Sequence, residues 1–116
     1  IKALENYYNA LRIIEKIGNE KWLSSTYNNL GYIYIQVKDY PKALELTEKS
    51  YQLSKKNKNE KALAVNLTNI AWLNELVGKI DLALVQAYEA MRLAASVNDD
   101  YHVAISWHIA GRIYLK

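Results

Sequence analysis

The sequence lacks the residues and runs that mark several large classes of protein. It has no cysteine in 116 residues, which excludes a disulfide framework and thiolate chemistry. No apolar run approaches the roughly 18 residues that a membrane-spanning helix needs, and no signal-peptide pattern opens the chain. We therefore expect a cytoplasmic protein that works without a membrane.

Side chains that carry chemistry are also few. His102 and His108 stand six positions apart, on different faces of one helix, and no Cys or HExxH pattern completes a metal site. Asp99 can touch His102, but a helix cap and a surface histidine explain that pair. No Ser/His/Asp order, Gly-rich phosphate loop or pair of carboxylates stands out. We expect neither catalysis nor a cofactor or metal.

The remaining composition is that of one small globular domain, with 51% hydrophobic residues and a net charge of +3. Four lysines near the middle of the chain raise the alternative of nucleic-acid binding. They are Lys55, Lys56, Lys58 and Lys61. A solvated helix end, where the helix dipole favours positive charge, explains this cluster. Because the neighbouring segments hold few basic residues on any face, we expect no nucleic-acid partner.

A repeat of 40 residues organises the chain. When the sequence is shifted by 40 positions, residues 29–33 (Asn-Leu-Gly-Tyr-Ile) lie on residues 69–73 (Asn-Ile-Ala-Trp-Leu), and residues 27–34 lie on 107–114. A second block, Lys-Ala-Leu-Glu at residues 2–5, lies on 42–45 and on 82–85. Internal periodicity of this kind indicates copies of one structural unit.

Each copy contains two helical segments, because apolar and small residues recur at i, i+3 and i+4. Asn19, Asn59 and Asp99 are the expected N-caps, and Pro41 suits the first turn of a helix. The expected helices cover residues 1–17, 20–37, 40–58, 60–77, 80–97 and 100–116. They form one domain over 1–116, in which 20–58 and 59–98 are full repeats, 1–19 is a second helix and 99–116 is a first helix.

Small residues fall where each helical hairpin has to close. Gly31, Ala71 and Gly111 share one place in the repeat, on its first helix. A glycine inside a helix costs about 1 kcal/mol relative to alanine, so its recurrence there needs a packing reason. We expect a second helix to pack closely at all three positions.

The motif Trp-x-x-Ala-Gly-x-x-Tyr at 107–114, with its copy Tyr-x-x-Leu-Gly-x-x-Tyr at 27–34, resembles the tetratricopeptide repeat. The usual period of that family is about 34 residues, so this chain is similar to its long-helix branch. Asn74 and Thr47 depart from the pattern, since Tyr and a large apolar residue are usual there. The resemblance implies an all-α fold, a right-handed α-solenoid of antiparallel helix hairpins.

The resemblance also implies a site, because the first helices of this family line a concave groove that holds an extended peptide or a partner helix. The matching positions are Asn28, Asn29, Tyr32, Gln36, Thr68, Asn69, Trp72, His108 and Arg112. Asn29 and Asn69 match each other, and an amide can pair with both N–H and C=O of a peptide backbone. The alternative is that these amides cross-link neighbouring helices. Tyr32 and Trp72 are aromatic anchors in one interpretation and inter-helix packing in the other.

These observations favour a protein-interaction module without catalysis, with a peptide or a partner protein as its ligand. Only Arg112 fits the carboxylate clamp of some members, so a C-terminal EEVD-type ligand is not favoured. One alternative is a regulatory or sensory segment of a larger signalling protein, in contact with its own kinase, cyclase or DNA-binding domain. Another is a structural spacer.

Because the chain starts without Met and within a repeat, we expect a fragment with open apolar ends that self-associate. The end residues are Ile1, Leu4, Tyr7 and Ile14 on one side and Trp107, Ile113 and Tyr114 on the other.

Overall fold

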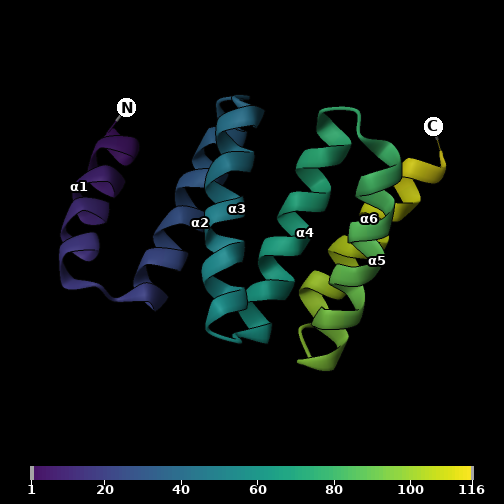
Figure 1. The fold of residues 1–116 in the computed structure, drawn as a ribbon. Coiled ribbons are helices and arrows are strands. Elements are labelled where there is room, and N and C mark those ends of the chain that lie inside the picture. The colour runs from purple at the N-terminus through teal and green to yellow at the C-terminus, as the bar shows by residue number, and fades with distance from the viewer. Residues whose placement is uncertain (1, 116) are drawn as a thin grey trace.

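The computed structural model describes residues 2–115, and this part of the chain is a row of six α-helices without a strand (Figure 1). The helices are α1 (Lys2–Ile17), α2 (Glu20–Gln36), α3 (Tyr40–Lys56), α4 (Glu60–Leu76), α5 (Ile80–Ser96) and α6 (Asp100–Tyr114). Each helix packs against the next one, and the whole measures 43 × 30 × 19 Å. The predicted all-α solenoid is confirmed. Its grouping into the repeats 20–58 and 59–98 stays a prediction.

A residue with left-handed backbone follows each of the first five helices. These residues recur every 20 positions and have φ between 54° and 89°: Gly18, Lys38, Lys58, Gly78 and Asn98. The left-handed conformation ends a helix and turns the chain. Glycine adopts it freely, whereas Lys38 and Lys58 carry a steric cost of about 1 kcal/mol each.

Side-chain caps begin four of the five helices that follow these turns. In each, a side-chain oxygen accepts a hydrogen bond from the backbone N–H three residues later; the four are Asn19, Asp39, Asn59 and Asp99. The predicted caps and the position of Pro41 in the first turn of α3 are confirmed. Lys79 makes no side-chain bond of this kind, so α5 begins without a cap.

Gly31 lets α2 and α3 approach closely. A Cβ at this position would lie 2.6 Å from Thr47 Oγ1 and 3.3 Å from the Ala43 carbonyl oxygen, so a larger side chain does not fit. The predicted packing reason for Gly31 is confirmed. At Gly111 a Cβ would meet nothing within 4 Å in the described structure, and since no second helix follows α6 there, the prediction for Gly111 stays a prediction.

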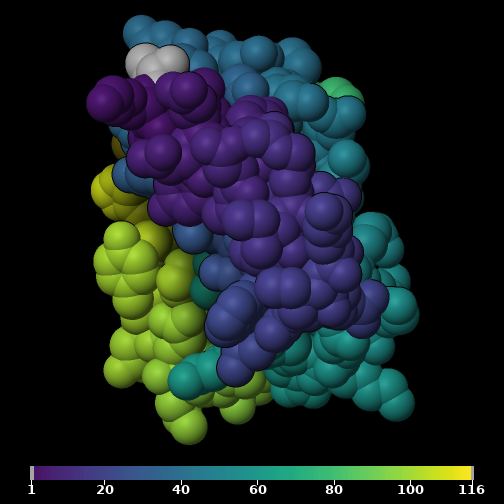
Figure 2. All heavy atoms as spheres, turned by 90° about the vertical axis from the view of Figure 1, so that its left-hand side faces the viewer, coloured from purple at the N-terminus to yellow at the C-terminus, as the bar shows by residue number. Residues whose placement is uncertain are grey.

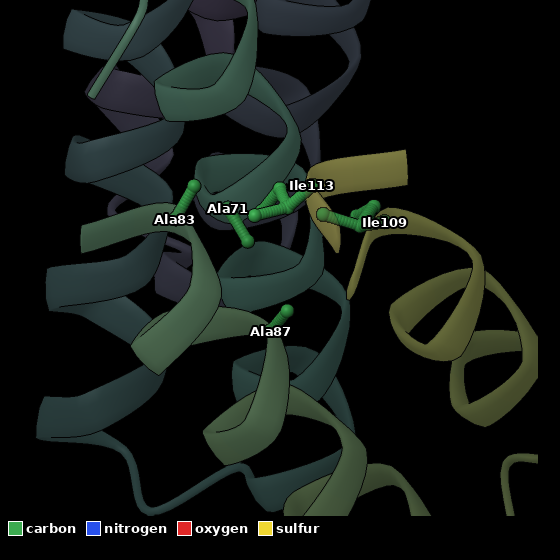
Figure 3. Close-up of a cluster of buried hydrophobic side chains, with 5 residues drawn as sticks. All are labelled: Ala71, Ala83, Ala87, Ile109 and Ile113. Carbon is green, nitrogen blue, oxygen red and sulfur yellow. The ribbon is translucent and has the colours of Figure 1, made fainter. Parts of the chain in front are cut away.

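A cluster of buried apolar side chains joins α4, α5 and α6 (Figure 3). Ala71 of α4 lies with Ala83 and Ala87 of α5 against Ile109 and Ile113 of α6. The alanines let the backbones approach, and the isoleucines fill the remaining volume. The predicted exposure of Ile113 at the C-terminal end is therefore wrong, since packing into this cluster leaves it only 8% exposed.

The other predicted end residues differ in their exposure. Leu4 and Tyr7 pack against the cluster formed by Leu11, Leu30 and Leu46, so they are not open as predicted. Ile14 is half-buried, and Ile1 lies outside the described residues. At the other end, Trp107 and Tyr114 are exposed, as predicted.

Alternate helices share one side of the row. α4 contacts α6 directly, and Asn28 of α2 accepts hydrogen bonds from two side chains of α4. Figure 2 looks from the α1 end, and the yellow-green C-terminal residues are visible beside α1, so the row does not run straight. Within residues 2–115, no helix is long and apolar enough to cross a membrane.

Candidate partner-binding groove

Two hollows open along α2, α4 and α6, and we refer to them together as the groove. The polar hollow lies between α2, α3 and α4 and has a volume of about 650 Å³. The aromatic hollow reaches from Tyr32 of α2 across α4 to α6 and has a volume of about 420 Å³. α2 and α4 contribute side chains to both hollows.

Four buried polar side chains form the floor of the polar hollow. They are Ser24, Ser50, Ser54 and Asn66, all at most 8% exposed. Ser24 Oγ lies 2.9 Å from Ser50 Oγ, and Asn66 Nδ2 donates to Ser50 Oγ at 2.9 Å. Ser54 Oγ donates a hydrogen bond to Asn66 Oδ1 at 2.9 Å. Burying such groups is costly unless they pair, and within the described chain no buried side-chain nitrogen or oxygen lacks a partner.

Two asparagines join the hollows. Asn66 Nδ2 and Asn69 Nδ2 both donate to Asn28 Oδ1, each at 3.2 Å. These bonds turn the Asn28 oxygen toward α4. Among the described residues nothing bonds to Asn28 Nδ2 or Asn69 Oδ1, which leaves one donor and one acceptor on this pair of side chains without a partner.

Aromatic rings surround the second hollow. Tyr32 is 52% and Tyr101 is 70% exposed, which is high for such large side chains. Trp72 is half-buried because it also packs against two core clusters, and Ile105 lies beside it. Trp72 thus packs between helices, as one interpretation had it, and it also lines the hollow. Its role as an anchor for a ligand stays a prediction.

Charged groups at the aromatic hollow are already paired. Arg112 donates to the Glu75 carboxylate in two places, from Nη2 to Oε1 at 2.7 Å and from Nε to Oε2 at 3.1 Å. Glu75 is 5% exposed, and a buried carboxylate needs such a partner. His102 Nδ1 lies 2.7 Å from Asp99 Oδ2. The groove therefore carries little uncompensated charge at this end.

The mouth of the polar hollow holds another pair. Lys56 Nζ donates to Glu20 Oε2 at 2.8 Å, across α3 and α2. This hydrogen bond is the main reason why the pKa of Glu20 is lowered from its ordinary value. Lys56, one of the four clustered lysines, is thus paired with a carboxylate. The exposed Lys21 adds a positive charge at the same mouth.

The structure places the predicted site residues unevenly. Tyr32, Asn69, Trp72 and Arg112 line the aromatic hollow, and Asn28 lines the polar one. The other exposed positions, which line neither hollow, are Asn29, Gln36 and His108. The hydrogen-bond partner of Asn69 is Asn28, although Asn29 is the residue that matches Asn69 in the repeat.

Thr68 requires a correction. It is 1% exposed and its hydroxyl donates to the Ala64 carbonyl oxygen at 2.7 Å, so it lies at the floor of the aromatic hollow and offers a ligand almost no surface. α4 is covered by helices on both sides, which buries a position that is partly open in α2.

Sequence reasoning missed several residues of the groove. They are Glu75, Tyr101 and His102 at the aromatic hollow, and Ser24, Ser54 and Asn66 at the polar one. A signal for the serines is present in the repeat, since positions 24, 50 and 54 hold serine where 64, 90 and 94 hold alanine. Among residues 2–115, no three His, Cys, Asp or Glu side chains are grouped to hold a metal ion.

Comparison with known families agrees with the repeat. A model described as tetratricopeptide repeat matches residues 1–56 and, in a second match, residues 22–96. No curated protein matches the chain. Repeats of the matching family generally mediate protein–protein interaction and typically have no catalytic role.

Proposed function

The chain belongs to the tetratricopeptide repeat family, and from this premise we propose that it binds a peptide or partner protein in the groove without catalysing a reaction. One observation carries the proposal. The exposed rings of Tyr32 and Tyr101 stand beside the unspent hydrogen-bonding groups of Asn28 and Asn69. Large aromatic side chains dominate binding energy in protein interfaces, and they need such polar neighbours to fix orientation.

The two asparagines suit the main chain of an extended ligand. Asn28 Nδ2 can donate to a peptide carbonyl, and Asn69 Oδ1 can accept from a peptide N–H. Because every residue of a ligand offers these groups, this contact supplies affinity without selecting a sequence. The aromatic hollow then receives an apolar side chain.

The charge distribution favours a protein ligand over a nucleic acid. Glu20 neutralises Lys56, and Glu75 neutralises Arg112. Binding a phosphate backbone depends on cations that are free to replace its counterions. Among the described residues that line the two hollows, Lys21 is the one lysine or arginine outside such a pair, and a single cation supplies little of that need.

An array of extended peptides, probed with the whole chain, tests the proposal. Tyr32→Ala is expected to weaken binding of the peptides found by about tenfold or more, at an unchanged melting temperature, because Tyr32 is exposed. Val85→Ala shortens an exposed apolar side chain of α5 that lies outside both hollows, and it serves as the control. Equal binding by the two variants would contradict the proposal.

Self-association is a second proposal, favoured by the exposed apolar surface of α6. Trp107 is 55% and Tyr114 is 70% exposed there. Apolar patches of this kind mark interaction surfaces. Light scattering over a concentration series is expected to show a rising mean mass, and a constant monomer mass would remove this proposal.

A further inference from the structure

In the polar hollow, the serine hydroxyls have more hydrogen-bond acceptors within reach than they have protons to donate. Ser24 Oγ has three acceptors within reach, namely the Ser50 carbonyl, Ser50 Oγ and Ser54 Oγ, at 2.9–3.1 Å. Ser54 Oγ has two, the Ser50 carbonyl and Asn66 Oδ1. A hydroxyl has one proton and rotates freely, so Ser24, the most exposed of the four at 8%, can turn to a ligand while Ser50, Ser54 and Asn66 still pair with one another.

The fold itself does not require this polarity. The positions that correspond after 40 residues are Ala64, Ala90, Ala94 and Ser106, in place of Ser24, Ser50, Ser54 and Asn66. All four are buried, and the three alanines are 0% exposed. An alanine floor therefore closes the same helix arrangement between α4, α5 and α6. None of these four residues lines the polar or the aromatic hollow, whereas Ser24, Ser50, Ser54 and Asn66 all line the polar one.

We propose that the polar hollow is a specificity pocket that receives a small, polar and uncharged side chain of the bound segment: Ser, Thr, Asn or Gln. The proposal rests on the proposed function, since it names the ligand that the groove selects. At the floor, Ser24 offers its hydroxyl, and Asn28 Nδ2 adds a donor without a partner at the edge of the hollow. The aromatic hollow takes the apolar residue of the same segment.

Other side chains fit this pocket less well. An apolar side chain would remove water from the serine hydroxyls and return no hydrogen bond, which is unfavourable. A charged side chain would leave water for a floor without a formal charge. An acidic residue would be drawn only to Lys21 at the mouth, a weak exposed contact.

Peptide libraries test the assignment directly. The probe is a set of extended peptides with one fixed tryptophan as the anchor, in which every other position is scanned in turn. With the unmodified chain, one scanned position is expected to prefer Ser, Thr, Asn or Gln over Ala, Val and Glu by about tenfold. The key variant replaces the polar residues by those found at the corresponding positions between α4, α5 and α6: Ser24→Ala, Ser50→Ala, Ser54→Ala and Asn66→Ser. It should lose that preference and still bind through the anchor.

Two safeguards keep the outcomes decisive. If the fourfold variant fails to fold, Ser24→Ala alone is used. Because Ser50, Ser54 and Asn66 still pair with one another in it, it should reduce the polar preference with little change in the melting temperature. Peptides that bind with no polar preference, or with an acidic one, overturn the pocket assignment and leave the proposed function standing. If no peptide binds the unmodified chain, the proposed function fails and the pocket assignment fails with it.

Discussion

The hairpin α2–α3 and the hairpin α4–α5 have one backbone arrangement and two different interiors. Towards the next helix, the first hairpin presents serines that are hydrogen-bonded to Asn66 of α4. The second presents alanines, and the residue that corresponds to Asn66 is Ser106. Ser and Ala are close in volume, and these positions are buried in both hairpins. Packing alone therefore does not decide whether they are polar or apolar.

The two interiors differ in how they are stabilised. In the second, buried methyl groups contribute through the hydrophobic effect, and each acts nearly alone. In the first, each polar group is tolerated only because its neighbours pair with it, and its net contribution is about 1 kcal/mol. The polar interior should therefore be more sensitive to the loss of one member.

The largest expected difference between the interiors comes from Asn66. Asn66→Ala leaves a cavity and removes a partner of Ser50, Ser54 and Asn28, which should lower the free energy of unfolding by about 3 kcal/mol. The matched change, Ser106→Ala, should cost about 1 kcal/mol. Urea denaturation of both variants measures the difference. Equal costs would mean that the polar network is not cooperative.

Glycines at one place in the repeat should respond with opposite signs. Gly31→Leu should cost about 1–3 kcal/mol, because Thr47 and Ala43 occupy the space. Gly111→Ala should add up to about 1 kcal/mol, since it meets nothing and alanine favours the helix. Thermal melts decide the matter, with the exposed Gln36→Leu as a near-neutral control. Two destabilising glycine variants would refute the assigned packing.

The second hairpin lacks a cap that the first one has. Asp39 accepts a hydrogen bond from the Lys42 N–H at 3.3 Å, whereas Lys79 at the start of α5 makes none. Lys79→Asp should therefore raise the free energy of unfolding by about 1 kcal/mol, and Asp39→Ala should lower it by a similar amount. Denaturation midpoints provide the test. A neutral Lys79→Asp variant would show that the N-terminus of α5 is satisfied by water.

The turn residue just before each cap position should favour the second hairpin instead of the first, and we expect the smallest change in stability here. The first hairpin turns at Lys38 with φ 64°, and the second turns at Gly78 with φ 89°. Lys38→Gly should stabilise by about 0.5–1 kcal/mol, because glycine carries no Cβ penalty there, and Gly78→Lys should destabilise by as much. Calorimetric melts can resolve both. A destabilised Lys38→Gly variant would contradict the assigned backbone strain.

Much of the fold followed from the sequence, because its signals are local. Asn19 and Asn59 cap the helices that they were expected to cap, and the predicted helix ends lie within two residues of those found. The groove was harder to predict from the sequence, since its contacts join residues far apart in the chain. Arg112 meets Glu75 and Asn69 meets Asn28 only after the helices have packed. The repeat correctly relates positions, but it does not give their burial.

The central claim is that a ligand lies along α2, α4 and α6. Backbone amide shifts in NMR spectra, recorded during titration with an array-selected peptide, test it most directly. We expect the largest shifts at Asn28, Tyr32, Asn69 and Tyr101, in a continuous path across both hollows. Shifts confined to the exposed residues of α3 and α5 would place the ligand on the other side of the row and contradict the claim.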